Sequence, residues 1–193
     1  RSGLVVFSIY LSGILLSAIV FILLMQLGSS PAAAFFGTLA VTLDNGLLVQ
    51  TRIIALDGIL LVGVFGALSA YLAAQNAAAY TRRIPLLILS GALCGLAVGT
   101  KFTGLTAIGL ITWLALATAL LEPSLANLVR QARRYLWVLA AAIATYLLGW
   151  AIVLAGVWAL GALLKTTARN RVEKALNSVV DRIPIVHSVY STA

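Results

Sequence analysis

The chain has 193 residues, of which 62% are hydrophobic and only 9% are charged, whereas soluble domains carry about 25% charged residues. This composition excludes a water-soluble fold, and the alanine- and leucine-rich runs lack the alternation of a β-barrel. The net charge of +8 comes from short basic clusters between apolar runs, as juxtamembrane charge does. We therefore exclude nucleic acid as a partner and expect membrane lipid.

The apolar runs predict an all-α, polytopic transmembrane helical bundle with about six membrane segments, because about 20 apolar residues cross a bilayer as a helix. Gly28 and Pro31 separate the first two segments, and Pro123 closes the fifth. Polar connections are expected over residues 75–83 and in a loop that follows Ser124. The first five helices are predicted at residues 4–26, 31–48, 53–74, 85–99 and 103–121.

The next apolar stretch, residues 135–164, would span about 45 Å as a helix. It predicts either one tilted helix or a hairpin broken near Gly149 or Gly156. After Lys165, apolar residues recur at helical spacing with basic residues elsewhere on the wheel. This pattern predicts a C-terminal amphipathic helix, either on a membrane surface or docked on its own protein.

The distribution of positive charge predicts the topology, since cytoplasmic loops carry excess lysine and arginine. The segment with Arg82 and Arg83 and the segment with Arg130, Arg133 and Arg134 are separated by two crossings, so both can be cytoplasmic. Lys101 is then on the opposite face. In the same topology the helix at residues 53–74 runs from the outer face inward, so Asp44, Arg52 and Asp57 also lie on the outer side. Four rare charges therefore gather at one leaflet, either as a polar pocket for an anion or as markers of helix ends that pair with one another.

Other residue types predict structure instead of chemistry. Cys94 is the only cysteine and His187 the only histidine, which excludes an internal disulfide, a histidine-based metal cluster and a catalytic triad. We expect no metal. Gly91, Gly95 and Gly99 are spaced four residues apart on one helix face, a pattern that favours close helix packing.

Two segments resemble one family, the protein O-mannosyltransferases. The stretch LDNGLLVQTRIIALDGILL (Leu43 to Leu61) is similar to the D-N, Q-S-R and L-L-D series of that family. The stretch TRRIPLLILSGALCGLAVGTKFTGL (Thr81 to Leu105) is similar to a later segment with paired arginines, a glycine-rich helix and a lysine followed by an aromatic residue. The resemblance covers about residues 1–121, with Thr51 in place of serine and Phe102 in place of tryptophan.

The resemblance implies a membrane glycosyltransferase of the GT-C type. Such an enzyme transfers mannose from dolichyl-phosphate mannose, or a polyprenyl analogue in bacteria, to serine or threonine hydroxyls of an acceptor protein. It implies that Arg52 and Lys101 bind the lipid phosphate and that Asp44 and Asp57 orient Arg52, with Asn45 in a supporting role. No cofactor beyond the lipid-linked sugar donor is implied.

The catalytic base is unknown. In the family an acidic pair that holds the presumed base lies in the first extracytoplasmic loop, and no acidic residue of this chain precedes Asp44. We therefore expect that the chain is a fragment whose general base lies upstream. The resemblance implies a location in the endoplasmic reticulum membrane in a eukaryote, or in the plasma or inner membrane in a prokaryote. The sequence allows an oligomer but does not predict its size.

The C-terminal residues, about 150–193, resemble a different family, the COV-like membrane proteins of unknown function. The stretch ARNRVEKALNSVVDRIPIVHSVYSTA (Ala168 to Ala193) carries this likeness. The sequence thus predicts a GT-C-like module over residues 1–134 and a COV-like segment over 135–193. The alternative functions are a non-enzymatic membrane protein of the COV-like type, in which the charges serve only topology, and a small transporter.

Overall fold

The computed structural model describes residues 2–43 and 55–180. Within these ranges the chain is helical and contains no strand, which confirms the all-α class. The elements are α1 (Ser2–Gln26), α2 (Pro31–Leu43), α4 (Ala55–Asn76), α5 (Tyr80–Thr100), the 3-10 helix η1 (Phe102–Gly104), α6 (Leu105–Leu121) and α7 (Leu125–Val180).

Four of the described helical segments are long and apolar enough to cross a membrane. They are Asp57–Asn76, Tyr80–Thr100, Phe102–Leu121 and Leu125–Leu163, and two shorter apolar helices cover Leu11–Gln26 and Pro31–Leu43. This set confirms the predicted helical membrane bundle. The chain divides into two compact units, residues 1–149 and 150–193.

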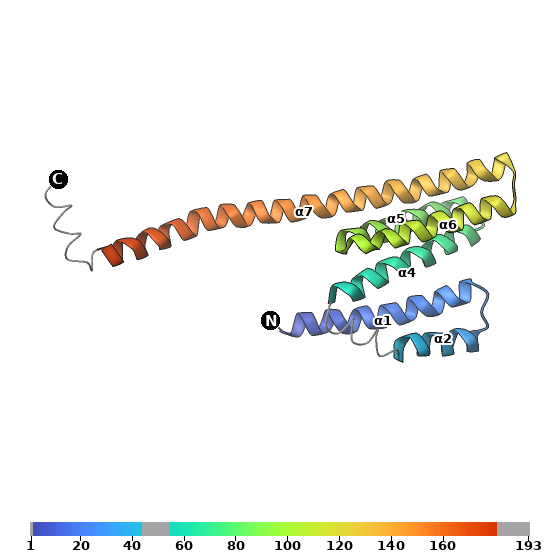
Figure 1. The fold of residues 1–193 in the computed structure, drawn as a ribbon, viewed down its shortest axis with the longest axis horizontal. Helices are drawn as coiled ribbons and strands as arrows, with labels where there is room; N and C mark the ends of the chain where they lie inside the picture. The colour runs from blue at the N-terminus through green and yellow to red at the C-terminus, as the bar shows by residue number, and fades with distance from the viewer. Residues whose placement is uncertain (1, 44–54, 181–193) are drawn as a thin grey trace. The chain divides into compact units, whose positions relative to one another are not determined.

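In the first unit, α4 is the central helix. It packs against α1, α5 and α6, and Figure 1 shows it between α1 and the α5–α6 pair. Its Tyr71 and Ala67 are fully buried, as are Cys94 on α5 and Ile111 on α6. Because lipid tails provide no hydrophobic drive between helices, small residues and a few hydrogen bonds must hold this core together.

Glycines on α5 bring helix backbones into direct contact. A Cβ built on Gly91 would lie 2.3 Å from the carbonyl oxygen of Val138, and one on Gly95 would lie 2.4 Å from that of Ala142. Val138 and Ala142 belong to the first part of α7. The predicted close packing is therefore confirmed for Gly91 and Gly95, whereas Gly99 has no atom within 4 Å of its Cβ position.

Local chemistry explains where the helices begin and end. Gly28 has φ +88° after α1, a conformation that glycine adopts without steric cost. The Ser30 hydroxyl accepts a hydrogen bond from the Ala33 N–H at 3.3 Å, and Pro31 occupies the first position of α2, where a missing N–H costs nothing. These boundaries agree with the sequence prediction.

Two predicted connections are wrong. The connection expected over residues 75–83 contains only residues 77–79, because α4 continues to Asn76 and α5 begins at Tyr80. Pro85, the expected start of the helix, lies inside α5. The loop expected to contain Arg130, Arg133 and Arg134 is part of α7, which begins at Leu125, and Ser124 precedes the helix as its cap. Its hydroxyl accepts the Asn127 N–H at 3.1 Å, as an N-cap residue does.

The second unit contains the continuation of α7 from Trp150 to Val180. No break occurs at Gly149 or Gly156, so the hairpin alternative is wrong and the single-helix alternative is confirmed. Large apolar side chains on this segment are exposed, Trp158 to 77%, as expected for a surface that faces lipid. The helix includes residues 165–180, and the proposed membrane-surface position of that part stays a prediction.

Candidate functional site

An ion pair joins the start of α4 to the end of α5. The Lys101 ammonium donates a hydrogen bond to the Asp57 carboxylate. The two residues are 44 positions apart in sequence, and the antiparallel packing of α4 and α5 brings them together. Asp57 lies in the first turn of α4 and Lys101 directly follows the last turn of α5, so each charge also has the sign that its helix dipole favours.

The backbone around Lys101 forms a sharp corner. Lys101 leaves the helix with φ −151° and ψ 147°, and its N–H still donates to the Ala97 carbonyl at 3.1 Å. Its own carbonyl accepts the Gly104 N–H at 2.8 Å, which closes η1. Gly104 lies so close to α5 that a Cβ there would be 2.3 Å from the carbonyl carbon of Ala97. The corner therefore depends on a residue without a side chain.

The pair leaves part of the lysine available to a ligand. The side chain of Lys101 is 39% exposed and that of Asp57 is 15% exposed. An ammonium group has three donors, and the carboxylate uses one of them. Phe102, the next residue in sequence, is 82% exposed, so the corner also exposes an apolar side chain. This arrangement suits a ligand that combines an anionic group with a hydrocarbon chain.

The structure brings together two of the five residues predicted for the site, Asp57 and Lys101. Asp44, Asn45 and Arg52 lie outside the described residues. The contact of Lys101 with Asp57 is the pairing expected if the charges mark helix ends. The family resemblance implies Arg52 as the partner of Asp57, and Arg52 lies outside the described residues. The roles of these residues stay predictions.

Arginines occupy the opposite end of the same helices. The Arg134 guanidinium donates to the Gln75 side chain at the end of α4, and the Arg83 guanidinium donates to the Ala77 carbonyl at 2.5 Å. Arg83 and Arg134 lie close enough to interact electrostatically. Because α5 has 21 residues, about 30 Å separates this end from Lys101. The two basic segments thus share one end, as the topology prediction requires.

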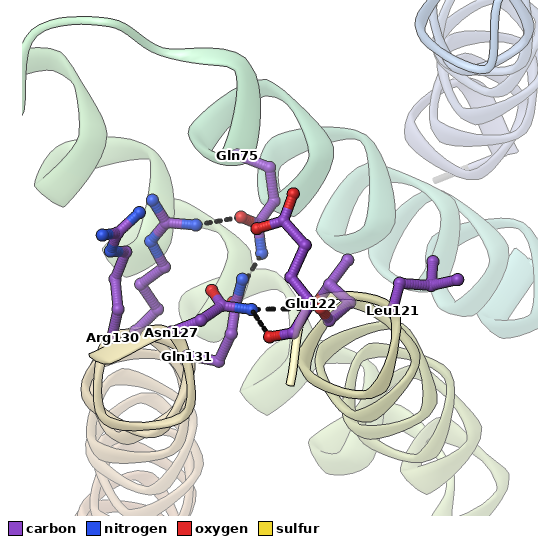
Figure 2. A pocket seen from close by; sticks show the side chains of 8 residues that line it. Gln75, Leu121, Glu122, Asn127, Arg130 and Gln131 are labelled. Atoms are coloured by element: carbon purple, nitrogen blue, oxygen red, sulfur yellow. Dashed lines mark hydrogen bonds between the residues drawn. The ribbon is translucent and has the colours of Figure 1, made fainter. Parts of the chain in front are cut away.

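A polar pocket lies at this arginine end, between the end of α4, the end of α6 and the start of α7 (Figure 2). Its volume is about 310 Å³. Figure 2 shows Arg130 and Asn127 coming from the start of α7, with Gln75 opposite and Glu122 coming from the end of α6. The lining residues are Gln75, Thr118, Leu121, Glu122, Asn127, Arg130, Gln131 and Arg134.

Sequence reasoning missed this pocket, although a signal was present. Asn127, Arg130, Gln131 and Arg134 are spaced by three, four and seven positions, which places them on one face of a helix. The prediction of a loop there concealed the shared face. The contribution of Gln75 could not be found in this way, because it requires the pairing of α4 with α7.

Comparisons with known proteins identify the family. The chain matches the family model of dolichyl-phosphate-mannose-protein mannosyltransferase over residues 4–160. No curated protein and no solved structure matches it. The match extends beyond residue 121, where the sequence resemblance was expected to end, and leaves the COV-like likeness of the last residues a prediction. Because the matched region is most of the chain, this integral membrane protein belongs to the dolichyl-phosphate-mannose-protein mannosyltransferase family.

Proposed function

We propose that the chain takes part in the transfer of mannose from a polyprenyl-phosphate donor, dolichyl phosphate in a eukaryote, to serine or threonine hydroxyls of a protein. Lys101 binds the donor phosphate, together with Arg52, and Asp57 positions Lys101. The single observation that carries the proposal is the contact between Lys101 and Asp57 at one end of the helix bundle. Family membership supplies the reaction class.

The chemistry places Lys101 on the leaving-group side. In the transfer, the bond between the sugar C1 and the phosphate oxygen breaks, and a bond from C1 to the acceptor hydroxyl oxygen forms. The phosphate leaves with the electron pair of the broken bond, so the negative charge on its oxygen atoms increases as it leaves. A fixed ammonium stabilises that charge most strongly in the transition state. No described residue is assigned as the base that takes the hydroxyl proton.

Asp57 has a positioning role. Its carboxylate holds the Lys101 ammonium at the corner between α5 and η1, which lowers the conformational entropy lost when the phosphate binds. Phe102 is exposed at the same corner and is the candidate for contact with the first isoprene units of the donor. Asp44 and Asn45 keep the supporting roles that the family resemblance implies.

The test measures donor binding as well as transfer. The full chain in lipid nanodiscs is titrated with polyprenyl phosphate, and this binding is the deciding measurement. Transfer from radiolabelled polyprenyl-phosphate mannose to a serine- and threonine-containing peptide is a second readout, because it also requires a general base that is not assigned among the described residues. Lys101→Ala is expected to weaken polyprenyl-phosphate binding. Where transfer is measurable, this variant should lower kcat/KM by about 100-fold, the loss typical of one removed charge-stabilising donor. Lys101→Arg should restore part of both.

The control is Lys165→Ala, which removes an exposed lysine of α7 and should leave binding and transfer unchanged. Asp57→Asn separates the two interpretations of the ion pair. If Asp57 positions Lys101, this variant weakens donor binding while the helix content stays intact. Donor binding in Lys101→Ala equal to that of the unmodified chain would show that the pair serves only the helix ends.

A further inference from the structure

The pocket at the arginine end is a second charged site, about 30 Å from Lys101 and unused by the proposed transfer. Its lining contains two cations, Arg130 and Arg134, and one carboxylate, Glu122. Arg83 and Arg133 lie outside the lining but close enough to Arg134 to act on it electrostatically. The local charge therefore favours an anion even with Glu122 included.

A hydrogen-bonded chain holds one of these cations in place. Arg134 donates to the Gln75 carbonyl oxygen, and the Gln75 amide nitrogen donates to Gln131 at 3.1 Å. Gln131 is only 7% exposed, so the chain is fixed to the packed side of α7. The guanidinium is thus oriented before any ligand arrives, which reduces the cost of binding.

The fixed guanidinium also has an unused donor. The Nε of Arg134 is buried and has no hydrogen-bond partner in the described part of the chain. A buried donor without a partner is costly, and more so in a charged group. Because protein atoms enclose the Nε itself, a ligand in the pocket would meet the terminal nitrogens of Arg134. Planar guanidinium donors match the oxygen atoms of phosphate, often two at a time. The pocket is large enough for one phosphate group, because its volume is about 310 Å³.

The rim of the pocket distinguishes the source of the phosphate. Leu121 lines the pocket and is 81% exposed, and Leu125 nearby in sequence is 78% exposed. Both lie at the ends of segments that can span a membrane, the level at which lipid headgroups lie. A soluble phosphate would gain nothing from these leucines, whereas a lipid would cover them with its acyl chains.

We propose that this pocket binds the phosphate of an anionic phospholipid headgroup, with Arg130 and Arg134 as the donors. The site is independent of the transfer site, since about 30 Å along α5 separates it from Lys101. Failure of one proposal therefore leaves the other unaffected.

The experiment compares two arginines of one helix. Arg130 and Arg133 are both exposed, but only Arg130 lines the pocket. The purified full chain in detergent is titrated with dioctanoyl phosphatidylglycerol by calorimetry. Arg130→Gln is expected to weaken binding about tenfold or more, because it removes a charge-assisted bond. Arg133→Gln should weaken binding by no more than about fivefold, the effect of one basic residue near a charged surface.

A second variant tests the site without removing an arginine. Gln75→Glu places a carboxylate beside Arg134 with almost no change in side-chain shape, so the protein supplies its own anion. This variant should lose phosphatidylglycerol binding while its helix content and elution volume stay unchanged. Phosphatidylcholine of the same chain length and inorganic phosphate complete the titrations, and both are expected to bind at least tenfold more weakly than phosphatidylglycerol.

Three results would overturn the proposal. Equal losses for Arg130→Gln and Arg133→Gln would show a diffuse surface attraction instead of a site. Inorganic phosphate that binds as tightly as phosphatidylglycerol would assign the pocket to a soluble anion. Undiminished phosphatidylglycerol binding by Gln75→Glu would exclude Arg134 as a donor.

Discussion

The variant Gly104→Ala tests the corner that positions Lys101. The added Cβ would lie 2.3 Å from the carbonyl carbon of Ala97, 2.4 Å from its oxygen and 2.5 Å from the nitrogen of Val98. All three are backbone atoms of α5 and cannot rotate away. The 3-10 helix η1 must move away from α5 by about 1 Å before the distance from the new Cβ to the Ala97 carbonyl carbon reaches the 3.4 Å of ordinary packing.

The expected cost follows from that displacement. Overpacking of a well-packed core costs about 1–3 kcal/mol, and here it also pulls the Gly104 N–H away from the Lys101 carbonyl. Gly109→Ala is the matched control, because it lies on α6 and a Cβ there has no atom within 4 Å. Replacement of a helical glycine by alanine should stabilise that variant by about 0.5–1 kcal/mol.

The assay is the free energy of unfolding of each variant, obtained from sodium dodecyl sulfate titrations followed by far-UV circular dichroism. Gly104→Ala should unfold at lower detergent fraction than the unmodified chain, and Gly109→Ala at higher. Polyprenyl-phosphate binding should fall in Gly104→Ala alone. A Gly104→Ala protein as stable as Gly109→Ala would refute the close approach of Gly104 to α5.

Two further predictions concern the packing of α5. Gly91→Ala should lower the free energy of unfolding by about 1–3 kcal/mol, because its Cβ would lie 2.3 Å from the Val138 carbonyl oxygen and 2.6 Å from the Ala141 methyl; detergent titration measures the change. Cys94 is fully buried in α5, so a membrane-permeant maleimide should label the folded chain far more slowly than the unfolded chain, as mass spectrometry would show.

Each of these predictions has its own control. Gly99→Ala lies on the same helix as Gly91 and its Cβ meets nothing within 4 Å, so it should unfold as the unmodified chain does or later. Equal destabilisation by both changes would contradict the contact between α5 and α7. Labelling of Cys94 at the same rate in folded and unfolded chain would place the thiol at an accessible surface.

The sequence allowed prediction of those helix ends at which a local signal exists. Gly28 with Pro31, and Pro123 with Ser124, mark breaks that depend only on neighbouring residues, and the structure has them there. The predicted start of α5 at Pro85 is wrong, because proline favours a first turn but is also tolerated inside membrane helices. The start of α7 is not predicted correctly, because a cluster of arginines after Pro123 is also typical of a loop. The signal for a helix there is Ser124, a residue that can cap a helix.

The candidate site was predictable only in part. Asp57 and Lys101 stand out because each is a charge at the end of an apolar run, and topology alone places them at the same membrane face. Their direct contact depends on the pairing of α4 with α5, which no local pattern specifies. The pocket near Arg130 could not be predicted, because the ends of α4 and α6 and the start of α7 form it together. For Arg52, Asp44 and Asn45, the prediction concerns residues outside those that the structure describes.

The ion pair has a consequence for how the protein enters the membrane. Asp57 and Lys101 stand at the two open ends of one helical hairpin, so under the predicted topology both must be carried across the bilayer during synthesis. Each charge alone would cost about 3 kcal/mol at the middle of a membrane helix. An ion pair formed before insertion is neutral overall and costs less to move through the hydrocarbon. We therefore expect α4 and α5 to insert together, so that neither helix crosses the membrane before the other.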